Sequence, residues 1–88
     1  MSVAGRKTVV ATASELFAGS SVLAGRLVMV VTNMDDSVAI VVGSTLTSGK
    51  VYGYTIEPGQ KERLTFPAPA TVYAQSLGRA VFVEVVEA

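Results

Sequence analysis

Hydrophobic and polar residues alternate with a period of two along most of the chain, which is the pattern of half-buried β-strands. The last segment, Ala80 to Glu87, follows this pattern closely. Its residues divide into an inner row and an outer row: Val81, Val83 and Val85, against Phe82, Glu84 and Val86. This segment is predicted to be a strand with one face in the core.

The segment from Arg26 to Asn33 is apolar on both faces, because Leu27, Met29 and Val31 on one face alternate with Val28 and Val30 on the other. This pattern predicts a central strand that is covered on both sides. The Asn, Asp and Ser residues in Asn33 to Ser37 predict a turn at the end of this strand. We expect Val38 to Val42 to return as the hairpin partner of this strand, to end at Gly43, and to be followed by a loop over Ser44 to Lys50.

The remaining segments are also rich in β-branched residues, which favour strands. They are Lys7 to Ala13, Ser14 to Ala18 as an irregular edge, Ser20 to Ala24, Val51 to Ile56, Lys61 to Phe66 and Thr71 to Gln75. Between two of them, Glu57-Pro58-Gly59-Gln60 predicts a type II turn. Turn residues recur about every 8–12 positions, the spacing of a sandwich or barrel.

The fold class expected from these segments is all-β, with about seven to eight short strands in an antiparallel β-sandwich or a small jelly-roll-like barrel. Residues 1–88 are expected to form one domain. The small and polar residues at the start predict a flexible N-terminal arm over about residues 1–7.

The composition indicates that such a domain needs a source of stability besides its own hydrophobic core. A chain of 88 residues has a thin stability margin, and small domains compensate with disulfides, metals or oligomerisation. There is no Cys and no His, while 50% of the residues are hydrophobic. We therefore expect association with other subunits, through the candidate interface residues Val9, Leu16, Phe17, Val28, Val30, Tyr52, Tyr54 and Phe82.

The charges argue against two classes of partner. The formal net charge is zero, and binding to nucleic acid or an anionic membrane surface needs clustered Lys and Arg. The longest apolar runs, Leu27 to Val31 and Val38 to Val42, are far shorter than the roughly 20 residues of a membrane span. No signal-peptide pattern is present, so we expect a chain that is made in the cytoplasm and not secreted.

Candidate chemistry is sparse. Without His or Cys, neither a Ser-His-Asp nor a Cys-His arrangement can form, and the usual zinc ligands are missing. Three pairs of polar residues each fit a turn or a strand edge better than a catalytic or metal site: Ser48 with Lys50, Glu57 with Glu62, and Asp35 with Asp36. The expectation is a protein that is not an enzyme and has no cofactor and no metal.

Several segments together resemble a known family. They are Arg26 to Asn33, Val38 to Gly43, Gly53 to Gly59, Val72 to Ala74 and Val81 to Val86. This succession is similar to that of capsid decoration (cement) proteins of tailed bacteriophages and of related virion-surface β-domains. The sequence departs from the family's pattern at Met34 to Asp36 and at Gln60 to Arg63.

The resemblance implies a β-sandwich that sits as a homotrimer on the outer capsid surface of the virion. It would bridge subunits of the major capsid protein and so stabilise the shell. One alternative is a head-fibre or tail β-domain that binds a host receptor or glycan. Another is a small hydrolase or a non-viral binding module.

Overall fold

The computed structural model describes residues 2–88 and contains eight β-strands and no helix. They are β1 (Val3–Val9), β2 (Ser14–Glu15), β3 (Val28–Asn33), β4 (Ile40–Thr47), β5 (Lys50–Ile56), β6 (Lys61–Thr65), β7 (Tyr73–Ser76) and β8 (Val81–Glu87). The all-β prediction is confirmed. Within residues 2–88 no helix is long and apolar enough to cross a membrane.

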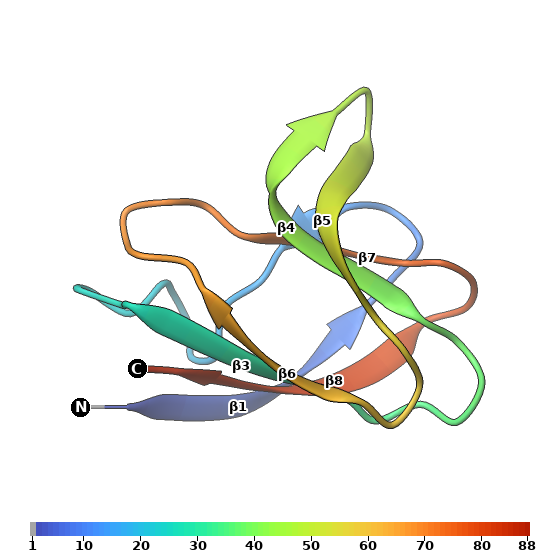
Figure 1. Ribbon diagram of the computed structural model, residues 1–88, viewed down its shortest axis with the longest axis horizontal. Helices are drawn as coiled ribbons and strands as arrows, with labels where there is room; N and C mark the ends of the chain where they lie inside the picture. The colour runs from blue at the N-terminus through green and yellow to red at the C-terminus, as the bar shows by residue number, and fades with distance from the viewer. Residues whose placement is uncertain (1) are drawn as a thin grey trace.

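The strands form two four-stranded antiparallel sheets in the orders β1-β8-β3-β6 and β2-β7-β4-β5. The first strand pairs with the last, β2 with β7, β3 with β6 and β4 with β5. These are the pairs of one long hairpin, which is rolled up so that β8 also meets β3 and β7 meets β4. This is the topology of a jelly roll, in which rolling leaves two facing sheets. Figure 1 shows the sheets and the hairpin β4–β5.

The core lies between the two sheets and is almost entirely aliphatic. In β8, Val81, Val83 and Val85 are completely buried, as the alternation predicts. Met29 and Val31 of β3 lie beside them in the same sheet, and Ile40 and Val42 of β4 contribute from the other sheet. Each buried aliphatic side chain of this size is worth roughly 1.5–3 kcal/mol, so these rows hold the sheets together.

Two predicted turns are found, but one of them has a different role. Gln60 N donates to Glu57 O at 3.0 Å, and Gly59 has φ +76°, as expected of the type II turn. The turn after Asn33 is present as well. However, β3 and β4 lie in different sheets and are not hairpin partners, so that prediction was wrong. The turn is a corner that carries the chain from one sheet to the other.

A second correction concerns the segment after Val42. Strand β4 continues through Gly43 to Thr47, and β5 begins at Lys50. The expected loop over Ser44 to Lys50 is therefore a continuous hairpin. Its two central residues, Ser48 and Gly49, have φ of 52° and 76°, the left-handed pair that a two-residue type I′ hairpin turn requires.

The expected flexible N-terminal arm is also corrected, since residues 3–7 belong to β1. All residues from Val3 to Val9 pair with β8. Backbone hydrogen bonds hold the segment whatever its side chains are, and Val3 packs against the core. Met1 lies outside the described residues.

In the predicted strand from Arg26 to Asn33, Leu27 lies before the start of β3 and is 65% exposed. It therefore does not share the inner face with Met29 and Val31, and its predicted placement is corrected.

The most unusual part of the interior is an ion pair between Arg26 and Glu87. Their side chains are completely buried, with Arg26 Nη1 at 3.0 Å from Glu87 Oε2. Arg26 also donates to the carbonyl oxygens of Phe66 (2.7 Å) and Ala70 (2.6 Å). Glu87 accepts from Ala18 N at 2.7 Å and from Leu23 N at 3.3 Å. The pair thus fixes two connecting segments, one between β2 and β3 and one between β6 and β7, to the end of β8.

Candidate interaction surfaces

The eight residues predicted to lie at an interface fall into three groups. Val9 and Leu16 are core residues, 1% and 3% exposed, so in this fold they do not reach a partner and that assignment is corrected. Phe17, Val28 and Val30 are partly buried. Tyr52, Tyr54 and Phe82 are 56%, 57% and 61% exposed. Alternation placed Phe82 in the outer row of its strand, but it could not separate Val9 and Leu16 from the others, since their burial depends on which sheet covers which face.

The exposed tyrosines lie on the hairpin β4–β5, which leaves the body of the sandwich. Strand β7 pairs with β4 only from Ile40 to Gly43, so the residues beyond Gly43 pair with β5 alone. Figure 1 shows this end projecting above the rest of the fold. The outer part of the hairpin therefore has no third strand.

Two glycines face each other where the hairpin leaves the sheet. A Cβ on Gly43 would lie 2.1 Å from Tyr52 O, and one on Gly53 would lie 2.3 Å from Val42 O. The pairing register also shifts between Val42 and Thr45, as at a β-bulge. Bulges bend a strand and increase its twist, and the glycines allow the two backbones to approach. This combination bends the outer hairpin relative to the sheet, while the Gln75 side chain of β7 still accepts from Val51 N at 3.1 Å and donates to Gly49 O at 3.3 Å.

The hairpin exposes three large apolar or aromatic side chains among small hydroxyl residues. Leu46, Tyr52 and Tyr54 are each more than 40% exposed, while Ser44 to Lys50 are all exposed. Tyr54 makes an edge-on contact with the ring of Phe66 at a centroid distance of 6.4 Å. A two-stranded hairpin is at best marginally stable in water without packing. These side chains are available to pack against another molecule.

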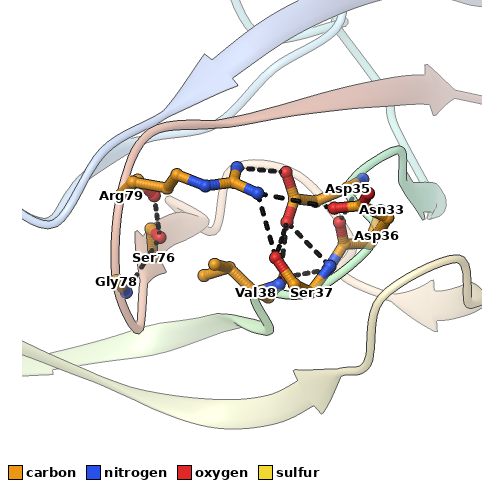
Figure 2. Close-up of polar contacts among 8 residues, drawn as sticks. All are labelled: Asn33, Asp35, Asp36, Ser37, Val38, Ser76, Gly78 and Arg79. Atoms are coloured by element: carbon orange, nitrogen blue, oxygen red, sulfur yellow. Dashed lines mark hydrogen bonds and ion pairs between the residues drawn. The ribbon is translucent and has the colours of Figure 1, made fainter.

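A polar cluster at another corner joins the β3–β4 turn to the β7–β8 turn (Figure 2). Buried Asn33 donates through Nδ2 to Val38 O (3.0 Å) and Ile56 O (3.1 Å), and accepts from Asp35 N at 2.9 Å. Asp35 in turn accepts from the backbone N of Ser37 and Val38, at 3.0 and 2.7 Å. This confirms a turn in which Asn and Asp side chains bind the nearby backbone.

Arg79, in the second turn, completes this cluster. It lies 2.5 Å from Asp35 Oδ1 and 3.4 Å from Asp36 Oδ1, and donates to Ser37 Oγ at 2.9 Å. The hydrogen bond from Arg79, followed by the backbone bond from Ser37, lowers the pKa of Asp35 from 3.8 to about 2. The carboxylate in turn raises the pKa of Arg79. The sequence does not reveal this pair, whose members are far apart along the chain.

Asp35→Asn is expected to give a protein whose stability deficit depends on pH. Because the folded-state pKa of Asp35 is lowered, its contribution is present above the unfolded-state pKa and is lost as the pH falls from about 4 toward 2. The difference in melting temperature between wild type and variant should be largest at neutral pH, shrink below about pH 4 and be mostly lost as the pH falls through the folded-state pKa of about 2. Thermal unfolding by circular dichroism at several pH values measures it. A difference that is constant from pH 7 to pH 2 would contradict the assignment.

The residue pairs considered for chemistry are not assembled into a site. Ser48 and Lys50 lie at the exposed end of the hairpin. Glu62 accepts a hydrogen bond from the side chain of Gln60, next to the turn that contains Glu57. Residues 2–88 contain no cluster of three or more acidic residues that could hold a metal ion. Every buried side-chain nitrogen and oxygen in this part of the chain has a hydrogen-bond partner.

Comparison with family models, with curated proteins and with solved structures found no match for this chain. The fold assignment therefore rests on the strand order and pairing in the structure. Taken together, the exposed features are a projecting aromatic hairpin and an outer sheet face that carries Phe82, and both are surfaces on which another protein can pack.

Proposed function

We propose that this chain is a structural virion protein that binds the outer surface of a phage capsid as a homo-oligomer, expected to be a trimer. It stabilises the shell by bridging subunits of the major capsid protein. The observation that carries this proposal is the projecting hairpin, whose Leu46 and Tyr52 are exposed where no third strand pairs with it, with Tyr54 exposed at its base. Jelly-roll domains are frequent in viral capsids, which agrees with this role at the level of fold alone.

The physical basis is selective binding. A protein that binds the assembled lattice and not the open or broken one shifts the equilibrium toward the lattice. Several copies held together by symmetry bind with a higher avidity than one copy. In this scheme the hairpin is the arm that contacts a neighbouring copy, because Tyr is enriched among the few residues that dominate the binding energy of an interface.

The first test measures the oligomeric state and then the binding to shells. We expect light scattering coupled to gel filtration to give a trimer at micromolar concentration. We also expect the protein to co-sediment with assembled shells of the major capsid protein encoded in the same genome. A monomer that does not sediment with shells would refute the proposal.

Substitution of the hairpin gives a sharper version of this test. The double variant Leu46→Ser with Tyr52→Ser is expected to shift the protein toward monomer. The dissociation constant should rise about tenfold for each 1.4 kcal/mol of binding free energy that is lost. Leu27→Ser is the matched control, since Leu27 is 65% exposed but lies outside the hairpin. Equal effects of the two changes would show that the hairpin has no special role.

One alternative is supported by the same side chains. Tyr52 and Tyr54 lie among exposed hydroxyl groups of Ser and Thr on the hairpin, and such a surface could bind a sugar in a fibre or tail domain. Binding of a glycan on an array, with loss of the signal in the Tyr52→Ser variant, would favour that role over capsid binding.

A further inference from the structure

The outer face of the sheet β1-β8-β3-β6 gathers charges that are separate in the sequence. Its residues are arranged in rows across the sheet, as the pairing register shows. One row contains Lys61, Thr32, Glu84 and Arg6, and the next contains Arg63, Val30, Val86 and Ala4. We call these two rows the cationic face.

The cationic face has an excess of positive charge although the whole chain is neutral. Three of its side chains are basic and one is acidic. Arg6 is paired with Glu84 at 3.3 Å, with both side chains more than half exposed. Among the described residues, Lys61 and Arg63 have no acidic partner within ion-pair distance. These two cations lie on the edge strand β6 and are exposed.

Beside the two cations the face is apolar and hollowed. Val30 and Val86 are opposite each other in the register and are only partly buried. Together with Thr32, Lys61, Arg63 and Glu84 they line an open groove of about 560 Å³. A ligand in this groove would contact aliphatic side chains below and cationic groups at the β6 edge.

We propose that the cationic face docks an acidic protein surface, in which carboxylates flank an aliphatic side chain. The carboxylates would pair with Lys61 and Arg63, and the aliphatic group would cover Val30 and Val86. This inference rests on the proposed function in one respect, namely that the chain acts by binding other protein subunits. It adds which face of the sheet binds the partner and which chemical groups the partner presents to that face.

The arrangement fits a protein partner better than a nucleic acid. Nucleic-acid binding relies on several cations along a phosphate track, whereas here Glu84 lies within the same face and valines form the floor. A like face of a second copy would be repelled, since each carries excess positive charge. Complementary charge with an apolar centre is the usual arrangement at a protein–protein interface.

A titration followed by NMR tests this proposal with defined probes. The labelled protein is mixed with a capped peptide of alternating Glu and Val, with the same peptide containing Lys in place of Glu, and with an oligothymidylate of equal negative charge. We expect amide shifts on β3, β6 and β8 with the Glu peptide alone, and weaker binding at higher salt.

Variants then locate the site. The double variant Lys61→Glu with Arg63→Glu should weaken binding of the Glu peptide by at least about tenfold, and Lys61→Gln with Arg63→Gln should weaken it less. Lys50→Glu is the matched control, because Lys50 is an exposed cation on the hairpin; it should leave binding unchanged. Equal loss in the control, equal binding of the Lys peptide or the oligothymidylate, or no binding of the Glu peptide would overturn the proposal.

The outcome is separable from that of the proposed function. If the protein is a trimer and sediments with shells, but Lys61→Glu with Arg63→Glu sediments equally well, the cationic face is not the docking surface and the capsid role stands. If the double variant loses its trimeric state instead, the face contacts a second copy, which also overturns the proposal. If shells are not bound at all, the peptide titration still decides whether the face binds acidic protein.

Discussion

Replacing Arg26 with Met is expected to lower the free energy of unfolding by about 3–5 kcal/mol, the usual cost of removing one member of a buried ion pair. Both side chains are fully buried, so Glu87 would be left as a charge without its cation. The carbonyl oxygens of Phe66 and Ala70 would also lose a donor. Small domains have a total stability of only about 5–15 kcal/mol, so this single change removes a large part of it.

Urea unfolding followed by circular dichroism measures this loss. Arg6→Met is the matched control, because Arg6 pairs with Glu84 on the surface, where side-chain exposures are 64% and 52%; such pairs are worth about 0–1 kcal/mol. The double change Arg26→Met with Glu87→Gln should be less harmful than Arg26→Met alone, since no unpaired charge remains and the amide oxygen can still accept from Ala18 N. Equal losses in the Arg26 and Arg6 variants would show that burial of the pair is unimportant.

Gly43→Ala is expected to have the second largest effect, a loss of about 1–3 kcal/mol or more from overpacking. The added methyl group would lie 2.1 Å from Tyr52 O and 2.8 Å from Gly53 Cα. Both are backbone atoms, so the strands β4 and β5 must move apart and their hydrogen bonds must lengthen. We expect faster amide hydrogen exchange in the outer hairpin as well as a lower unfolding midpoint.

The control for this substitution is Gly78→Ala. Its new Cβ would meet the side chain of Val38 at 3.2 Å, and a side chain can adjust by a few tenths of an ångström where a backbone cannot. Hydrogen exchange confined to the hairpin would place the strain where the glycines face each other. If both variants had the same stability and exchange, the close approach of the strands would not be essential to the fold.

Local features of the fold could be predicted from the sequence because they depend on neighbouring residues. The alternation in Val81 to Val86 determined which side chains of β8 enter the core. Pro58 and Gly59 determined a turn, since Pro restricts φ and Gly tolerates the positive φ that the third position needs. Composition also excluded His- and Cys-dependent chemistry outright.

Pairing between distant strands was decided only by the tertiary structure. The segment after Asn33 looked like a hairpin partner because adjacent strands often pair, but in a jelly roll each strand of the first half pairs with one of the second. The same rolling brings Arg26 to Glu87 and Arg79 to Asp35. No local pattern encodes these contacts, since each partner is more than forty residues away along the chain.

The candidate interaction surfaces were likewise predicted in part from the sequence and decided in part by the tertiary structure. Tyr52, Tyr54 and Phe82 could be proposed as interface residues from the sequence, because large side chains on a short strand must face either a core or a surface. Val9 and Leu16 have the same residue character but lie in the core, since the opposite sheet covers them. The cationic face was invisible in a chain of zero net charge, because only antiparallel pairing places Lys61 and Arg63 beside Val30 and Val86. The sequence by itself thus determined the all-β class, most of the strand segments and the Pro-Gly turn, and the long-range pairing of the sheets decided which side chains are left to meet a partner.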